Sequence, residues 1–166
     1  MPADSEAREK WSAYPNTILA FAAPEPLRVD LRTRVSDEQR RALAAAGWAN
    51  PFAVFTAENP SGDHAEDTPT ADAAAAKERK NRDRRGALRG ELRARGLRLR
   101  EVEASAPNGE YSEQCVAVDV ALADARRIAR EFDQLALFWY DGTVFWLVPA
   151  KLGETPVALP GAIADD

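Results

Sequence analysis

The chain has 166 residues, of which 45% are hydrophobic and 30% are charged, and its formal net charge is -5. This length suits one domain with a substantial hydrophobic core. No apolar run approaches the roughly 18 residues that a membrane-spanning helix needs, and the charged start of the chain lacks the apolar stretch of a signal peptide. We therefore expect a soluble, cytoplasmic protein with one domain over residues 14–152 and flexible tails at 1–13 and 153–166.

Soft metal ligands are scarce in this sequence. With one cysteine, Cys115, the chain cannot form an internal disulfide, and it contains one histidine, His64. His64 lies among Asp63, Glu66 and Asp67, but their spacing matches no established metal site. We therefore predict no metal and no cofactor.

The net charge conceals a strong asymmetry. Residues 77–100 contain eleven basic and three acidic residues, a balance of +8, so the rest of the chain carries -13. Such segregation bears on partners and ligands rather than on the fold. Two interpretations stay open at this point: a solvated helix face, or a surface for an anionic ligand or partner.

The first part of the domain has two strand patterns and one helix pattern. Residues 17–21 are apolar, and apolar and charged residues alternate over 27–31, which is typical of a strand with one wet face. A capping box of Ser36 and Gln39 then opens a helix over 36–46.

The middle of the chain predicts a central strand, a long loop and the longest helix. Residues 52–57 are apolar or small on both faces, which places this strand in the middle of the sheet. An acidic loop over 59–72 is too long for a simple turn. The helix over 71–95 follows, and Gly86 and Gly90 each weaken it by about 1 kcal/mol relative to alanine.

The remaining elements complete an α+β pattern. They are strands over 97–104 and 116–120, a helix over 121–132, and strands over 135–140 and 143–148 on either side of the turn sequence Asp141-Gly142. From residue 52 onward this order is that of a ferredoxin-like split-βαβ core. We therefore predict such a core with two extra N-terminal strands and a helix, closing with a C-terminal β-hairpin. The sheet should be mixed or antiparallel, with its helices largely on one face.

Four short motifs occur in an order typical of one protein family. They are Thr56-Ala57-x-Asn59-Pro60; Asn81 and Arg84 followed by Leu88, Leu92 and Gly96; Gly109-Glu110-Tyr111-x-Glu113; and Phe132-Asp133-Gln134-Leu135. In this order the chain resembles the bacterial family catalogued as domain of unknown function 3293, over roughly residues 13 to 150. Leu135 departs from the family's usual asparagine, so a ligand contact made by that amide is lost or replaced. The resemblance implies no established activity.

A polar stripe on the long helix indicates a ligand site. Asn81, Arg84 and Arg85 share a helical stripe with Leu88 and Leu92, which need a core. Polar groups on such a stripe are costly unless they find partners, and the end of a central strand beside them is a plausible ligand position. The predicted ligand-binding residues are Thr56, Asn59, Asn81, Arg84, Arg85, Glu110, Glu113 and Gln134.

A purely structural role for these residues stays open. Asn59 before Pro60 can be a turn residue. Asn81 and Arg84 can satisfy loop carbonyl groups, and Glu110 or Glu113 can pair with an arginine. Whether the chain is an enzyme also stays open, because two glutamates permit acid–base chemistry without requiring it.

Two functions from different classes compete. The first is binding of a small anionic or nucleotide-like ligand, because arginine recognises planar anions and amides read hydrogen-bonding edges. The alternative is an RNA- or protein-binding module that uses the basic helix 77–100 and has no catalytic activity. We rank nucleic acid second, because the isoelectric point is about 5.1 and no aromatic-rich RNA-binding strand is present. No membrane partner is expected.

Overall fold

The computed structural model describes residues 9–22, 25–49, 51–58, 70–151 and 153–160. These residues form one curled sheet of eight strands, in the order β2-β1-β4-β5-β3-β6-β7-β8, in which every neighbouring pair is antiparallel. The strands are β1 (Ile18–Phe21), β2 (Leu27–Asp30), β3 (Phe52–Phe55), β4 (Leu99–Ser105), β5 (Ser112–Val118), β6 (Ala136–Tyr140), β7 (Phe145–Pro149) and β8 (Val157–Ala158). The α+β class and the antiparallel sheet expected from the sequence are confirmed.

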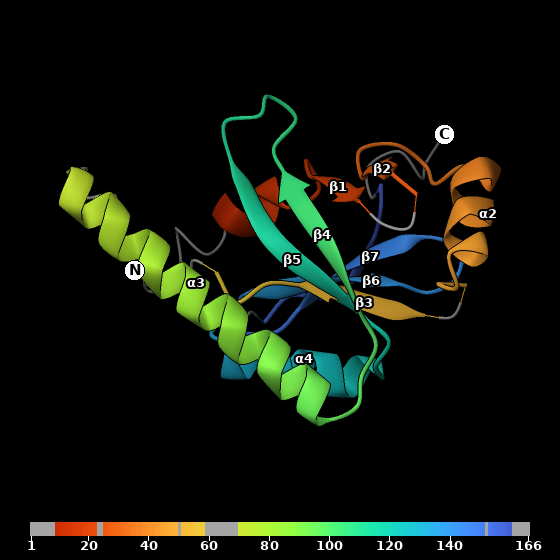
Figure 1. Cartoon of the computed structure of the whole chain (residues 1–166). Helices are drawn as coiled ribbons and strands as arrows, with labels where there is room; N and C mark the ends of the chain where they lie inside the picture. Colours follow the sequence, from red (N-terminus) through yellow and green to blue (C-terminus); the bar gives the residue numbers. More distant parts are fainter. Residues whose placement is uncertain (1–8, 23–24, 50, 59–69, 152, 161–166) are drawn as a thin grey trace.

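Among the described residues, three of the helices cover the two faces of this sheet: α2 (Asp37–Ala45), α3 (Ala71–Ala94) and α4 (Leu122–Glu131). The predicted helices over 36–46, 71–95 and 121–132 agree with these bounds to within a residue. In Figure 1, α3 runs from the left to below the sheet, where α4 lies beside its end, whereas α2 lies at the right. No helix among the described residues is both long enough and apolar enough to cross a membrane.

The sheet separates two hydrophobic clusters. Leu88 and Leu92 of α3 pack with Ile128 of α4 in one cluster. Leu43 of α2 belongs to the other cluster, which contains most of the large aromatic side chains. Two of the three helices therefore share a face, and α2 covers part of the opposite one.

β3 is the central strand that the sequence predicts. All of its residues are buried, because Phe52 and Val54 enter the aromatic cluster while Ala53 and Phe55 enter the cluster under α3 and α4. A strand covered on both faces needs apolar side chains at every position. The chain therefore leaves β3 at a buried position.

The helix ends follow the capping signals in the sequence. Ser36 and Gln39 form the complete capping box at the start of α2, and Gly47 after its end has a φ of +86°. Thr70 caps the start of α3. The buried residues of α3 are Asn81, Leu88 and Leu92, and Figure 1 shows its N-terminal half extending beyond the sheet.

The last hairpin differs from its prediction in the length of its loop. The sequence predicts a strand over 143–148, whereas β7 begins at Phe145 and pairs it with Tyr140. The carboxylate of Asp141 accepts hydrogen bonds from the backbone N–H groups of Thr143 and Val144 and from the indole of Trp146. These bonds stabilise a four-residue loop in place of a two-residue turn.

A final strand, β8, lies in the range 153–166 that the sequence predicts as a flexible tail. Within the described part of this range, Val157 and Ala158 pair with β7, and Leu159 is buried in the aromatic cluster. This part of the chain is therefore held by the sheet. A two-residue strand is too short to give an alternating pattern, which is why the sequence does not reveal it.

Two glycines, Gly90 within α3 and Gly47 after α2, allow a test of these local conformations. A Cβ atom added at Gly90 would meet no atom within 4 Å, so Gly90→Ala should raise the free energy of unfolding by about 1 kcal/mol through helix propensity alone. Gly47→Ala should lower it by about 1–2 kcal/mol, since Gly47 has a positive φ. Urea denaturation of both variants measures the difference, and a destabilising Gly90→Ala would contradict the exposed position of Gly90.

Candidate functional site

A buried polar cluster begins where β3 ends. Thr56 and Glu58 follow the strand directly, and both are buried. The hydroxyl of Thr56 donates to the carbonyl oxygen of Gln114 at 2.7 Å and accepts the backbone N–H of Glu58 at 3.1 Å. Thr56 therefore fixes the path of the chain as it leaves the sheet beside β5.

Glu58 is the centre of this cluster. Its Oε1 accepts from Nη1 of Arg85 at 3.0 Å, and its Oε2 accepts from the backbone N–H of Gln114. Its backbone carbonyl oxygen accepts from Nε2 of Gln134 at 3.0 Å. One residue thus connects the end of β3 with α3, with β5 and with the turn between α4 and β6.

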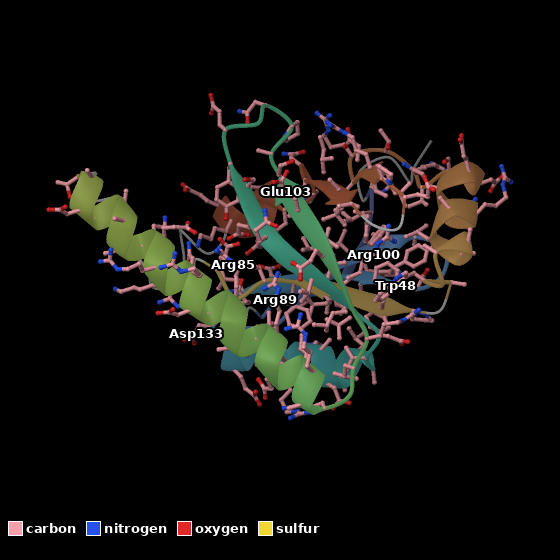
Figure 2. All side chains as sticks on the ribbon, viewed as in Figure 1. Trp48, Arg85, Arg89, Arg100, Glu103 and Asp133 are labelled. Carbon is pink, nitrogen blue, oxygen red and sulfur yellow. The ribbon has the colours of Figure 1, made fainter. Side chains whose placement is uncertain are left out.

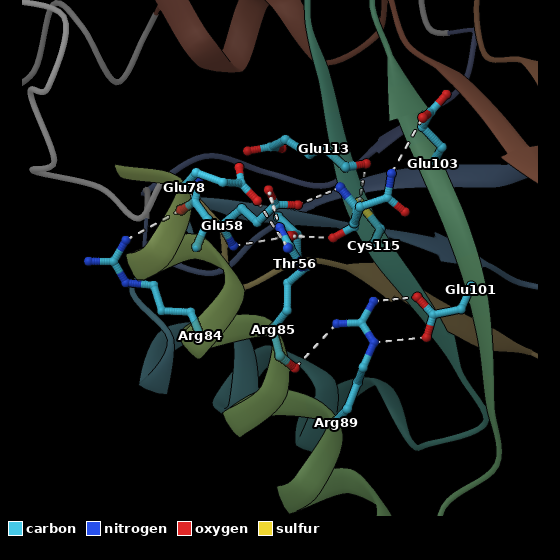
Figure 3. Close-up of polar contacts among 12 residues, drawn as sticks. Thr56, Glu58, Glu78, Arg84, Arg85, Arg89, Glu101, Glu103, Glu113 and Cys115 are labelled. Carbon is cyan, nitrogen blue, oxygen red and sulfur yellow. Dashed lines mark hydrogen bonds and ion pairs between the residues drawn. The ribbon is translucent and has the colours of Figure 1, made fainter. Parts of the chain in front are cut away.

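Arg85 lies between a buried and an exposed carboxylate (Figure 3). Its Nη1 bonds to Glu58, whose side chain is 7% exposed, and its Nη2 bonds to Oε1 of Glu78 at 3.2 Å, whose side chain is 61% exposed. The backbone carbonyl of Arg85 accepts from Arg89, which in turn pairs with Glu101. The guanidinium of Arg85 is therefore fixed from the inside and reaches the protein surface on its other side.

Asn81 and Arg84 lie on the neighbouring turns of α3. Asn81 is buried, and its Oδ1 accepts from Nη1 of Arg84 at 3.5 Å, a long contact. In Figure 3 the guanidinium groups of Arg84 and Arg85 point in different directions from the helix. The two arginines therefore do not converge on one atom: Arg85 belongs to the cluster at Glu58, and Arg84 lies beside it.

The electrostatics of the cluster are set by burial. Burial raises the pKa of the Glu58 carboxyl above its ordinary value, and the Gln114 N–H and the Arg85 guanidinium only partly offset this effect. The pKa of Glu101 is lowered, chiefly because Arg89 donates hydrogen bonds to its carboxylate. The pKa values of Glu58 and Glu101, two carboxyl groups beside the same helix, are thus shifted in opposite directions by their surroundings.

The predicted site residues occupy three places. Thr56, Arg85 and Gln134 meet at Glu58, with Asn81 and Arg84 beside them; Asn59 lies outside the described residues, as does His64. Glu110 is in the exposed turn between β4 and β5. Glu113 is in β5, directly before Gln114, whose backbone N–H donates to Glu58.

Gln134 differs from its predicted role as a ligand contact, and Glu58 has no role in the sequence prediction. Both bonds recorded for the amide nitrogen of Gln134 go to backbone carbonyl oxygens, of Glu58 and of Phe132, so this group supports the cluster. Glu58 is absent from the predicted set, although it stands between Thr56 and Asn59. The available signal was an acidic residue directly after a fully apolar strand.

No metal site is visible in the described part of the chain, where no three His, Cys, Asp or Glu side chains are grouped so as to hold an ion. The arrangement instead offers hydrogen-bond donors from arginines and amides around a buried carboxylate. Such a group of polar side chains at the end of a central strand is typical of a binding site.

The fold and this cluster define an α+β protein with a polar site at the end of its central strand. Residues 55–137, which are 83 of the 166 residues, match the model of a family described as a protein of unknown function, DUF3293. The chain belongs to this family, and the matched segment contains every described residue of the cluster. No curated protein and no solved structure matches the chain.

The buried carboxylate should make stability depend on pH. Because the pKa of Glu58 is raised in the folded state, its protonated form stabilises the fold below the ordinary value of 4.5. This contribution is lost as the pH rises through the raised pKa. The free energy of unfolding of the native chain, minus that of Glu58→Gln, should therefore decrease as the pH rises above 4.5.

Urea titrations of both proteins across the acidic and neutral range measure this difference. Glu78→Gln is the matched control, since it removes the exposed carboxylate bound to the same arginine. If the difference in the free energy of unfolding grew with pH, the effect of Arg85 on the pKa of Glu58 would outweigh the effect of burial.

Proposed function

We propose that this protein binds a small anionic or nucleotide-like ligand at the end of β3. Arg85, Arg84 and Asn81 are the ligand-contacting residues in this proposal, with Thr56, Glu58 and Gln134 as their support. The observation that carries it is the position of Arg85 between buried Glu58 and exposed Glu78. The ligand's anionic group takes the place of the Glu78 carboxylate.

The energetics favour this exchange. Exposed ion pairs contribute only about 0–1 kcal/mol, so a ligand displaces Glu78 at little cost. The bond to Glu58 holds the Arg85 guanidinium in place beforehand, which reduces the entropy lost on binding. Arginine also offers two parallel N–H donors to a carboxylate or phosphate.

Residues near Arg85 bind the hydrogen-bonding part of the ligand in this proposal. Asn81 supplies an amide on the same helix, two turns before the buried Leu88. Asn59 stays in the proposal because it directly follows Glu58 in the chain. Glu110 lies apart from the cluster in the exposed turn between β4 and β5, so it does not contact the ligand in this proposal. Glu113 directly precedes Gln114 in β5 and stays a candidate contact.

The proposed frame of the site is a ferredoxin-like split-βαβ core from β3 to β6. The strand order β4-β5-β3-β6 supports it, because β5 separates β3 from β4 and β3 separates β5 from β6. Packing of α3 and α4 in one cluster supports it further. The proposed setting of the protein is the bacterial cytoplasm.

A thermal-shift screen of nucleotides and small organic anions tests the proposal. We expect at least one compound to raise the unfolding temperature of the native chain. Glu78→Gln should bind that compound up to about five times more tightly, because the competing carboxylate is gone. The double variant Glu58→Gln/Arg85→Gln, which replaces the buried pair by amides without changing the net charge, should lose the response.

The matched control is Arg89→Gln/Glu101→Gln, which removes the neighbouring ion pair in the same way. It should keep the response of the native chain. Equal responses from both double variants would contradict a site at Arg85, and weaker binding by Glu78→Gln would contradict the displacement of Glu78.

The second candidate function is a nucleic-acid module on the outer side of α3. Arg79, Arg82 and Arg93 are exposed, and their spacing places them on one side of the helix. Arg89 is less suited to this role, because it is paired with Glu101. Three exposed arginines in a row favour contact with a phosphate backbone.

We expect only weak binding of single-stranded RNA, lost between about 50 and 200 mM salt, because a few arginines release few counterions. Fluorescence anisotropy with a labelled oligonucleotide measures the affinity. Binding that survives physiological salt and disappears in Arg79→Glu/Arg93→Glu would favour the nucleic-acid function over the small-ligand function.

A further inference from the structure

The β4–β5 hairpin presents a polar face to α3. Glu101 of β4 forms an ion pair with Arg89 of α3. Side chains alternate along a strand, so Glu103, two residues further on, lies on the same face, and Gln114 of β5 is directly opposite Glu103. In Figure 2, Glu103 lies across from Arg85 and Arg89, where α3 faces the hairpin, and Figure 3 shows the same arrangement at close range.

Gln114 connects this polar face with the cluster at Glu58. Its backbone N–H donates to Oε2 of Glu58, which holds Arg85 through its other oxygen. Its side-chain Nε2 donates to Oε2 of Glu103 at 3.4 Å. One residue of β5 therefore separates the buried carboxylate that positions Arg85 from the exposed carboxylate of Glu103.

Glu103 and Gln114 present their hydrogen-bonding atoms in a defined order. A carboxylate only accepts hydrogen bonds, so the atom of Gln114 that meets Glu103 is the amide nitrogen, a donor. Both residues are exposed and their contact is long. The amide nitrogen keeps its second hydrogen for another partner, and the carboxylate keeps lone pairs on both oxygens. Taken from β5 to β4, the order is donor, acceptor, acceptor.

This order is complementary to the Watson–Crick edge of guanine. That edge presents the acceptor O6, followed by two donors, N1–H and the N2 amino group. Adenine presents a donor followed by an acceptor, so it would place like groups opposite Gln114 and Glu103. A site built to hydrogen-bond one edge discriminates strongly against an edge that leaves its polar groups unpaired.

We propose that the ligand of the site at Arg85 is a guanine nucleotide, whose phosphate group binds Arg85 and whose base is recognised by Glu103 and Gln114. This inference rests on the proposed function, because the phosphate is the anionic group that takes the place of the Glu78 carboxylate. The ribose lies between them, beside the backbone of β5. Glu103 then determines which base the protein accepts.

Isothermal titration calorimetry with guanosine, inosine and adenosine monophosphates (GMP, IMP and AMP) tests the recognition of the base. The three probes share the ribose phosphate, and therefore the contact with Arg85. IMP lacks the N2 amino group, and AMP reverses the donor and acceptor. We expect GMP to bind the native chain about ten times more tightly than IMP, as for the loss of one hydrogen bond to a charged group, and AMP to bind more weakly than IMP.

Glu103→Gln replaces the carboxylate by an amide of the same size. GMP should then bind within about two-fold of AMP, because one acceptor has become a donor. The matched control Glu110→Gln removes an exposed carboxylate from the turn of the same hairpin and should keep the preference of the native chain. Urea denaturation of both variants checks that they fold.

Gln114→Met provides a second measurement, since it removes the amide donor but keeps the backbone N–H that bonds to Glu58. It should weaken the binding of GMP by about five-fold and change that of AMP by less than about two-fold. An equal loss for both nucleotides would contradict recognition of the base by Gln114.

Equal affinities of GMP and AMP for the native chain, or a preference for GMP that persists in Glu103→Gln, would overturn the inference. If these affinities are lost in Glu58→Gln/Arg85→Gln, the anion site at Arg85 stands without recognition of guanine. A response to a different small anion, with none to GMP, has the same meaning. Only the absence of any anion response would overturn both proposals together.

Discussion

The buried carboxylate of Glu58 holds together segments that are far apart in the chain. It bonds to Arg85 of α3 and to the backbone of Gln114 in β5, and its carbonyl group bonds to Gln134. Removing one partner of a buried ion pair leaves the other charge uncompensated, which is strongly destabilising. This contact, together with the packing of Leu88 and Leu92 and the ion pair between Arg89 and Glu101, holds α3 against the sheet.

The basic segment of the chain has two different environments. Arg85 and Arg89 form ion pairs with Glu58 and Glu101 on the side of α3 that meets the sheet. Arg79, Arg82 and Arg93 are exposed to solvent. The inner arginines position α3 and the outer ones determine its surface potential. A count of charges along the sequence cannot separate these two groups, because the separation depends on which side of the helix meets the sheet.

Local patterns in the sequence predicted the helices and most strands, because the residues that make up each of these signals lie within a single helix or strand. The capping box of Ser36 and the apolar run at Phe52 are of this kind. Pairing of β1 with β4 depends instead on long-range contacts. Glu58 was missed for the same reason, since its partners Gln114 and Gln134 lie 56 and 76 residues further along the chain. An acidic residue after a strand normally indicates a loop, and only tertiary contacts make it buried.

The two edges of the sheet are short. One edge is β2, with four residues, and the other is β8, with two. Edge strands expose unpaired backbone groups on which another chain can add a strand, and short edges offer few of them. Growth of the sheet from one molecule into the next is therefore disfavoured at both ends. Association of this chain with a protein partner would then rely on side chains, and the N-terminal half of α3 extends beyond the sheet.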